Sequence, residues 1–208
     1  MPANTNPLPD VPADLKGLLR DLDLADDEAR QLVNSLNDQQ LNWRPDGGTR
    51  WSVAQCLDHL AQINAIYIAA LSEAVHGVKP STEARRDPIQ PGWLARWFIG
   101  VLEPPPKRKL KSPKKALPSA QKAGTEVLRA FIAAHDQARA LIQEAGELDL
   151  NRIRFKNPFI GFLRFTVGSG LLIINAHDRR HLWQARQVLA SMERGQAQGG
   201  AAVNQAGS

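Results

Sequence analysis

Histidines at helical spacing are the residues in this sequence best suited to bind a metal ion. His177 and His181 are four residues apart, so both rings would leave the same face of a helix, one turn apart. Such a pair can chelate one divalent ion, although a surface pair or two packed core histidines would show the same spacing. Both positions continue the apolar row of Ile173, Ile174 and Val188. This pattern predicts that the two rings point toward the protein interior.

A third histidine, His59, lies on or beside the apolar stripe of an earlier helical segment that also carries Cys56 and Ile63. Three inward imidazoles could occupy three positions around a divalent ion and leave the others open to water or substrate. This arrangement is typical of catalytic metal sites rather than of closed structural ones. The ion would act as a Lewis acid. The sequence pattern assigns the three histidines as metal ligands and leaves the catalytic residues unknown.

The single cysteine, Cys56, limits the kinds of metal site that the chain can build. One thiol cannot form an internal disulfide, a zinc ribbon or a zinc finger, so the ligands of any metal must be His, Asp or Glu. Cys56 also lies among apolar neighbours, Val53, Leu57 and Leu60. This setting favours an inert small hydrophobic side chain over a thiol nucleophile.

Two glutamines are placed to support the histidines. Gln62 follows His59 by three residues, and Gln184 follows His181 by three residues, so each shares a helix face with its histidine. We expect these two side chains to hydrogen-bond the ligands or water at the ion.

Two carboxylates next to the proposed ligands and the two remaining histidines of the chain are further candidates. Asp58 and Asp178 each adjoin a histidine, but neighbours on a helix point about 100° apart. They are therefore expected in ion pairs or behind the ligands rather than as ligands. His76 and His135 have no partner at ligand spacing and are not predicted to bind the ion, unless a tertiary contact brings them in.

Four segments with helical periodicity must position these residues, at about 11–37, 53–75, 119–145 and 166–194. The second begins with Ser52 and Gln55 in the pattern of a capping box. We therefore predict an all-α protein, a four-helix bundle over 1–193 with a long crossover insertion at 79–118 between helices 2 and 3. Residues 194–208 are mostly Gly, Ala and Gln with little to bury, which predicts a disordered tail. Residues 152–155 could form a short extended piece.

The insertion carries the positive charge of the chain. The segment from Lys79 to Arg129 contains twelve Lys and Arg but only four Asp and Glu. The remainder of the chain contains 14 Lys and Arg and 17 Asp and Glu. Repeated prolines there prevent a long helix, and the apolar stretch 92–102 is predicted to dock on the bundle as a short helix. The basic run 107–115 could attract an anionic substrate, bind nucleic acid or be a solvated loop. No aromatic residues interleave with its cations, so no nucleic acid partner is predicted.

Length and hydropathy suggest a location. The 208 residues suffice for one core, and no stretch approaches 18 uninterrupted apolar residues. The first residues lack the charged and apolar regions of an export signal. We therefore expect a cytoplasmic protein with no membrane partner, and a possible homodimer through an exposed face of the bundle.

Three blocks of sequence together resemble the DinB superfamily. They are Trp43-Arg44-Pro45, the W-S-x-x-x-x-x-x-H-L stretch at 51–60, and the H-x-x-x-H stretch at 175–184. The resemblance covers about residues 15–191. It implies a four-helix bundle with a long crossover and a divalent metal ion, most often nickel or zinc, held by three histidines that match His59, His177 and His181.

The resemblance also implies a function. Relatives include metal-dependent transferases and isomerases that use small thiols such as mycothiol or bacillithiol, and others are described as metal-dependent hydrolases. We therefore expect a divalent-metal-dependent enzyme that activates water or a small thiol, as a thiol transferase or a hydrolase, on a small-molecule substrate. The alternative is a non-catalytic bundle that keeps the metal for stability and binds a ligand or partner through the insertion.

Overall fold

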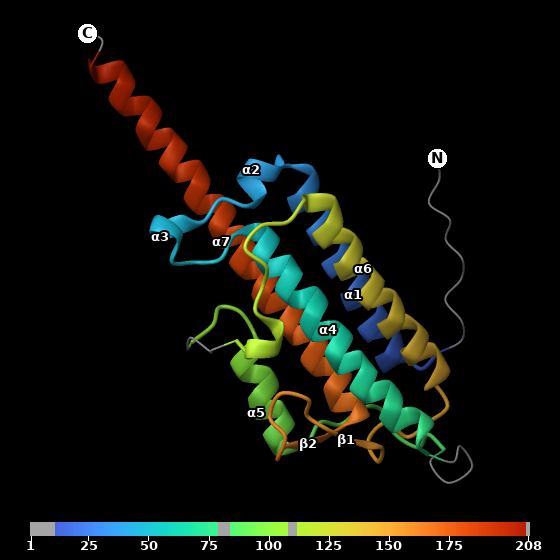
Figure 1. Ribbon diagram of the computed structural model, residues 1–208. Helices are drawn as coiled ribbons and strands as arrows, with labels where there is room; N and C mark the ends of the chain where they lie inside the picture. Colours follow the sequence, from blue (N-terminus) through green and yellow to red (C-terminus); the bar gives the residue numbers. More distant parts are fainter. Residues whose placement is uncertain (1–10, 79–83, 108–111, 207–208) are drawn as a thin grey trace, which may run out of the picture.

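Four long helices form the body of the protein, which a computed structural model describes over residues 11–78, 84–107 and 112–206. They are α1 (Ala13–Asn34), α4 (Val53–His76), α6 (Gly124–Glu144) and α7 (Val167–Ala206), as Figure 1 shows. The shorter elements are α2 (Asp38–Leu41), α3 (Pro45–Gly48), α5 (Trp93–Leu102), the 3-10 turn η2 (Lys114–Ala116), β1 (Arg154–Lys156) and β2 (Arg164–Thr166). The predicted all-α bundle is confirmed.

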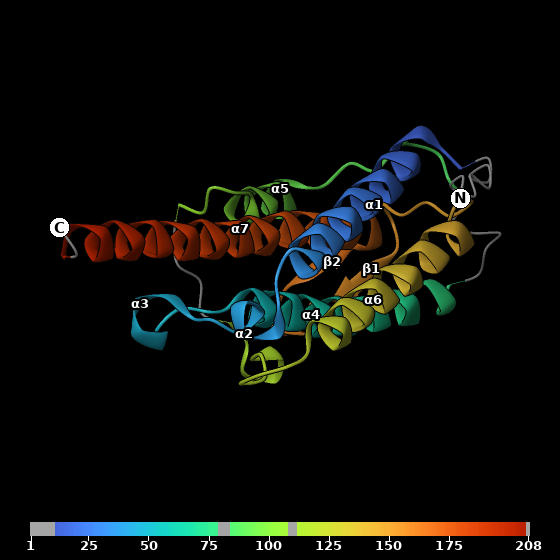
Figure 2. The same ribbon diagram turned by 90° about the horizontal axis from the view of Figure 1, so that it is seen from above.

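The bundle is not a simple up-and-down arrangement. Helix α4 packs against α6 and α7, and α1 packs against the same two helices. Helices α1 and α4 are therefore diagonal neighbours in the bundle, and so are α6 and α7, although each pair is consecutive among the long helices (Figure 2). The insertion between α4 and α6 places α5 along the outer side of α7. Within the described residues no helix is long and apolar enough to cross a membrane.

Helix α4 begins at the predicted capping box. The backbone N–H of Gln55 donates to the Ser52 hydroxyl at 3.1 Å, and the backbone N–H of Ser52 donates to the Gln55 side chain at 3.2 Å. The Gln55 amide also donates to the backbone carbonyl of Ser119 at 3.1 Å. The start of α4 is thereby tied to Ser119, which directly follows the insertion and lies five residues before the first residue of α6.

Two parts of the fold differ from the sequence prediction. Helix α7 continues to Ala206 and extends past the other helices (Figure 1), through most of the segment 194–208 that was expected to be a disordered tail. Ala and Gln favour helix, and a helix that grows from a packed segment needs no new nucleus. The expected extended piece is β1, but it pairs with β2 in an antiparallel hairpin that the sequence did not predict. Three-residue strands are too short to show alternation.

A layer of buried polar side chains divides the bundle core into two apolar clusters. One cluster contains Leu15, Leu71 and Leu141, and the other contains Leu32, Leu57, Phe131 and Leu182. Between them lie four polar residues, one from each long helix: Asp26 of α1, Asn64 of α4, His135 of α6 and Asp178 of α7. Each has at most 4% of its surface exposed. Buried polar groups of this kind are tolerated only when they are paired.

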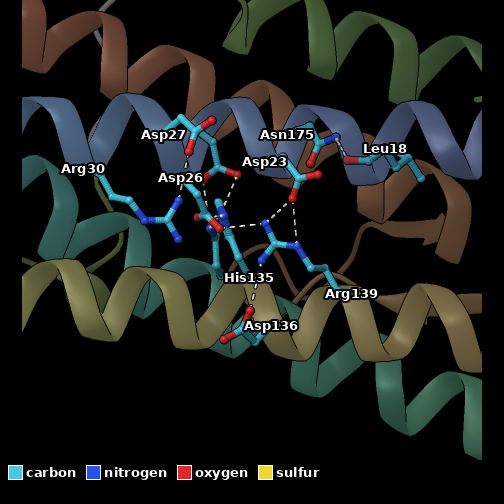
Figure 3. Close-up of polar contacts among 11 residues, drawn as sticks. Leu18, Asp23, Asp26, Asp27, Arg30, His135, Asp136, Arg139 and Asn175 are labelled. Carbon is cyan, nitrogen blue, oxygen red and sulfur yellow. Dashed lines mark hydrogen bonds and ion pairs between the residues drawn. The ribbon is translucent and has the colours of Figure 1, made fainter. Parts of the chain in front are cut away.

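His135 is the centre of this polar layer. Its Nδ1 donates to Asp26 Oδ1 at 2.7 Å, and its Nε2 lies 3.3 Å from Asp178 Oδ2 in an ion-pair contact. The Asn64 amide donates to Asp178 Oδ1 at 2.8 Å, and Arg139 donates to Asp26 Oδ2 at 2.7 Å. Figure 3 shows the Asp26 side of this arrangement. All four long helices are therefore joined in one polar network, with the His135 imidazole at its centre.

The surrounding carboxylates keep His135 charged. Burial alone would lower its pKa, but Asp178 and Asp26 raise the pKa to about 9. Burial would likewise raise the pKa of Asp26, but the hydrogen bonds and charges of His135 and Arg139 lower it. At neutral pH the layer therefore consists of an imidazolium between two carboxylates. Its partners come from three other helices, so no spacing within one helix could reveal them.

Removal of the charged imidazole should destabilise the fold strongly. We expect His135→Ala to lower the free energy of unfolding by about 3–5 kcal/mol, because two buried carboxylates lose their cation. The matched control is His76→Ala, which removes an exposed contact to Glu144 and should cost less than about 1 kcal/mol. Urea unfolding of the metal-free proteins measures both. Equal losses in the two variants would contradict the assignment of His135 to a stabilising ion pair.

The contribution of His135 to the free energy of unfolding should also depend on pH. The pKa of His135 is raised from 6.5 to about 9 on folding, so its contribution is fully present below pH 6.5 and is lost as the pH rises toward 9. His135→Gln keeps a polar side chain without the charge. The difference in unfolding free energy between wild type and this variant should therefore shrink between pH 6 and about pH 9.5. A difference that stays constant over this range would show that His135 is neutral in the folded protein.

Candidate metal centre

Three histidines meet between α4 and α7. His59 of α4 and His177 and His181 of α7 each offer one nitrogen, and the three nitrogens lie within 4.8 Å of one another. The ring centroids are 4.6 Å apart for His177 and His181, 4.7 Å for His59 and His181, and 5.3 Å for His59 and His177. The structure thus brings together the three residues that the sequence singles out as metal ligands.

Hydrogen bonds fix the tautomers of two of the rings. His59 Nδ1 lies 2.6 Å from the backbone carbonyl of Ala116, and His181 Nδ1 lies 3.0 Å from the side-chain oxygen of Gln184. Both oxygens can only accept, so Nδ1 carries the proton in each ring. The lone pair of each neutral ring is then on Nε2, where it can bind an ion.

The third ring, His177, leaves a nitrogen unused. Its Nδ1 is buried and has no hydrogen-bond partner among the described residues. No internal hydrogen bond therefore competes for this nitrogen, and three imidazoles are a donor set that suits zinc or nickel. Nitrogens around a tetrahedral zinc ion lie about 3.4 Å apart. The three ring nitrogens, now within 4.8 Å of one another, would therefore approach each other by up to about 1.4 Å around an ion. The residues present fit a divalent ion.

The electrostatic environment keeps the three rings neutral. Burial lowers the pKa of all three. The neighbouring histidines and Arg180 add to the effect of burial, which places the pKa of His177 well below 6.5 and that of His181 at about 3. A neutral imidazole is the form that donates a lone pair to a metal. The cluster is therefore in its ligating form at neutral pH.

An aromatic side chain borders the three rings. Trp51 is stacked on His181 with ring centroids 5.6 Å apart, and its ring lies 4.9 Å from that of His59. Trp51 follows a turn that includes α3, in which Gly47 and Gly48 have φ values of 63° and 88°, a region that favours glycine. The sequence patterns described above do not indicate this role for Trp51. Its position directly before a capping box was the available signal, since that position often packs against the first turn.

The end of the insertion is held against α4 beside His59. Ala116, whose carbonyl accepts from His59, is completely buried. Asp58 accepts from the backbone N–H of Ser119 at 2.7 Å and thereby anchors the same segment. Gln62 donates to Asp58 at 2.9 Å instead of reaching the histidines, so it supports the insertion rather than the rings. Asp58 is thus in a supporting position, as expected, and not among the ligands.

The middle of the insertion is held against α7. Arg180 donates to the backbone carbonyl of Val101 at 3.0 Å, and Arg179 pairs with Glu103 at 2.5 Å. Helix α5 therefore docks on the bundle, as predicted, on the helix that carries two of the histidines. The middle and the end of the insertion consequently both contribute to the surroundings of the cluster. Residues 79–83 and 108–111, which include part of the basic run, lie outside the described residues.

A pocket of about 1080 Å³ opens over the histidines. Much of its wall is apolar, with Ile63, Phe98, Leu102, Phe159, Ile173 and Ile174 among the lining residues. Arg50, Lys107 and Arg180 also line it, whereas none of the lining residues in the described parts of the chain is Asp or Glu. An anionic ligand would therefore be favoured in this pocket.

The remaining candidates from the sequence lie away from the pocket. Cys56 is fully buried in an apolar cluster, where burial raises the pKa of its thiol to about 12. At neutral pH this thiol is protonated, in agreement with an inert packing role. Asp178 faces His135 and Asn64 in the polar layer. His76 lies at the surface next to Glu144.

Comparisons with known proteins agree with this architecture. Residues 21–185 match the model of the DinB superfamily. The chain is 26% identical over 163 residues to the uncharacterized protein YuaE of Bacillus subtilis (strain 168), covering 78% of this chain and 91% of that one. Its fold is similar to the solved structure of YfiT from Bacillus subtilis, with a TM-score of 0.58 and 17% identity, covering 90% of this chain and 93% of that one. YfiT is described as a probable metal-dependent hydrolase with an unusual four-helix bundle topology. With a family match over most of its length, the chain belongs to the DinB superfamily.

Proposed function

We propose that this protein is a divalent-metal-dependent enzyme that acts on a small anionic molecule. The observation that carries the proposal is the convergence of three neutral imidazoles, from His59, His177 and His181, in an apolar pocket lined by cations. The description of YfiT as a probable metal-dependent hydrolase supports it. Zinc and nickel are the ions that best suit three nitrogen ligands with open positions.

The side chains around the centre would each contribute a defined part. A divalent ion held there supplies Lewis-acid chemistry, because it lowers the pKa of a water or thiol that binds to it. Gln184 and the Ala116 carbonyl hold the His181 and His59 rings in orientation through their Nδ1 protons. Trp51 shields one side of the rings from water. Arg180 contributes positive charge next to the pocket.

The pocket chemistry favours a small thiol as the first candidate nucleophile. No carboxylate among the described lining residues is placed to take a proton from water, whereas the cations would attract a thiolate and the anionic groups of its carrier. In thiol transfer the thiol would lose its proton to solvent, and the sulfur would form a bond to an electrophilic carbon as the bond from that carbon to its leaving group breaks, so that the leaving group departs with the electron pair to solvent. Hydrolysis of an ester or amide is the second candidate, which the description of YfiT favours.

Metal binding should depend on all three histidines. Wild type is expected to bind one zinc or nickel ion per chain, measured by calorimetric titration of metal-free protein. His59→Ala, His177→Ala and His181→Ala should each lower the affinity by at least about a hundredfold, because loss of a ligand costs more than loss of a supporting contact. The matched control, His76→Ala, should bind as wild type does. Unchanged uptake in His177→Ala would refute the proposed centre.

Catalysis should require the bound ion. Protein stripped with a chelator and reloaded with zinc or nickel is assayed with two panels, small thiols paired with electrophiles and simple esters or amides. We expect turnover with the thiol panel that disappears on chelation and in His177→Ala, because the thiol then keeps its ordinary pKa. Turnover with esters alone would select the hydrolase. A protein that binds the ion and gains thermal stability but turns over neither panel would be the non-catalytic binding bundle instead.

A further inference from the structure

The pocket continues from the histidines along α4 toward Tyr67. Tyr67 follows His59 by eight residues, which is about 12 Å along the helix axis. Ile63 lies between them on α4, and Ile63 and Ile174 of α7 both line the pocket. The wall between the two ends is therefore apolar, and a polar group appears again at Tyr67 and Asn157.

The hydrogen bonds of Asn157 determine what Tyr67 can do. The side-chain oxygen of Asn157 accepts from the backbone N–H groups of Phe159 and Ile160 at 2.9 and 2.8 Å. This pairing fixes the orientation of the amide, so its Nδ2 points at Tyr67 and donates to the phenol oxygen at 2.5 Å. The phenol oxygen is thus an acceptor in this contact, and its own proton must go elsewhere.

Among the described residues, the Tyr67 hydroxyl takes part in the contact with Asn157, where it accepts, and no residue accepts its proton. Only 4% of the Tyr67 surface is exposed, so bulk water does not replace an acceptor. The ring is held between Phe155 and Phe159, each with its centroid 5.8 Å away. A buried donor in a rigid ring, at the wall of a pocket, lacks an acceptor that a ligand could supply.

We propose that Tyr67 is a second binding point of this pocket, and that its hydroxyl donates a hydrogen bond to a carbonyl-type acceptor at the far end of an elongated ligand. The near end of that ligand is the group that binds at the three histidines, and this part rests on the proposed function. The ligand is then a molecule with an apolar or methylene body of about 10 Å, comparable to the offset between the two ends along α4. Burial raises the pKa of Tyr67, so the phenol stays protonated and acts as a donor and not as a base.

Two series of probes test the proposal on zinc-loaded protein. The first contains ω-mercaptoalkanamides of increasing chain length, and the second contains alkanethiols of matching length without the terminal amide. In wild type we expect the amide to improve binding by about tenfold at one favoured chain length. Tyr67→Phe, which removes only the hydroxyl, should abolish that gain while alkanethiols bind as before. Equal amide gains in wild type and Tyr67→Phe would overturn the proposal.

A spectroscopic readout separates ligand contact from a structural role. Tyr67 is the only tyrosine of the chain, so protein labelled with ¹³C at the tyrosine phenol carbon gives one resonance. This resonance should shift when the mercaptoalkanamide of the favoured length binds and stay in place with the matching alkanethiol. The control Phe98→Leu reduces apolar contact in the same pocket and should weaken both series equally. A resonance unmoved by the bound amide would also overturn the proposal.

Failure of the metal proposal has a different signature. If the histidines bind no ion, thiols should bind no more tightly than the corresponding alkanes, both to wild type and to Tyr67→Phe. The Tyr67 contact is then measured on metal-free protein with alkanamides that lack the thiol, through the fluorescence of Trp51 and Trp183 at the pocket wall. Alkanamides should still bind wild type more tightly than Tyr67→Phe, and equal binding to both would refute the Tyr67 contact itself.

Discussion

A cation held between two carboxylates at the centre of the bundle is the contact on which the rest of the structure depends. His135 joins Asp26 and Asp178, and Asn64 completes the link to the fourth helix. An apolar layer at this level would tolerate small sliding of one helix past another, whereas a buried ion pair is satisfied in one register only. Because Asp178 lies in the turn of α7 between His177 and His181, the same register also places these histidines opposite His59.

The insertion gives the bundle a pocket that four helices alone would not enclose. Its end is fixed to α4 through Asp58 and its middle to α7 through Arg180, and Phe98 and Leu117 of this segment line the pocket. The bundle thus supplies the three imidazoles, while the inserted segment supplies much of the surface that a ligand would meet. This division separates the parts of the chain that would set metal chemistry from those that would set substrate choice.

Much of this could be read from the sequence because it depends on local patterns. Helical periodicity and one capping box located the four long helices, and i,i+4 spacing with an inward face located His177 and His181. What could not be read depends on contacts between distant segments. His135 gains its charge from residues on α1 and α7, β2 exists only by pairing with β1, and Gln62 turns to Asp58 because the insertion returns there. Local spacing carries none of this information.

The hydrogen bond from His59 to the Ala116 carbonyl joins a ring of the candidate metal centre to the backbone of the insertion. Two sites that share such a contact are thermodynamically linked. If displacement of the 3-10 turn lowers the affinity of the ring for an ion by some factor, the bound ion makes displacement of the turn less favourable by the same factor. Sequence changes in the insertion can therefore adjust ion affinity without altering a ligand. A molecule that fills the pocket and displaces this turn would therefore bind with an affinity that depends on whether the ion is bound.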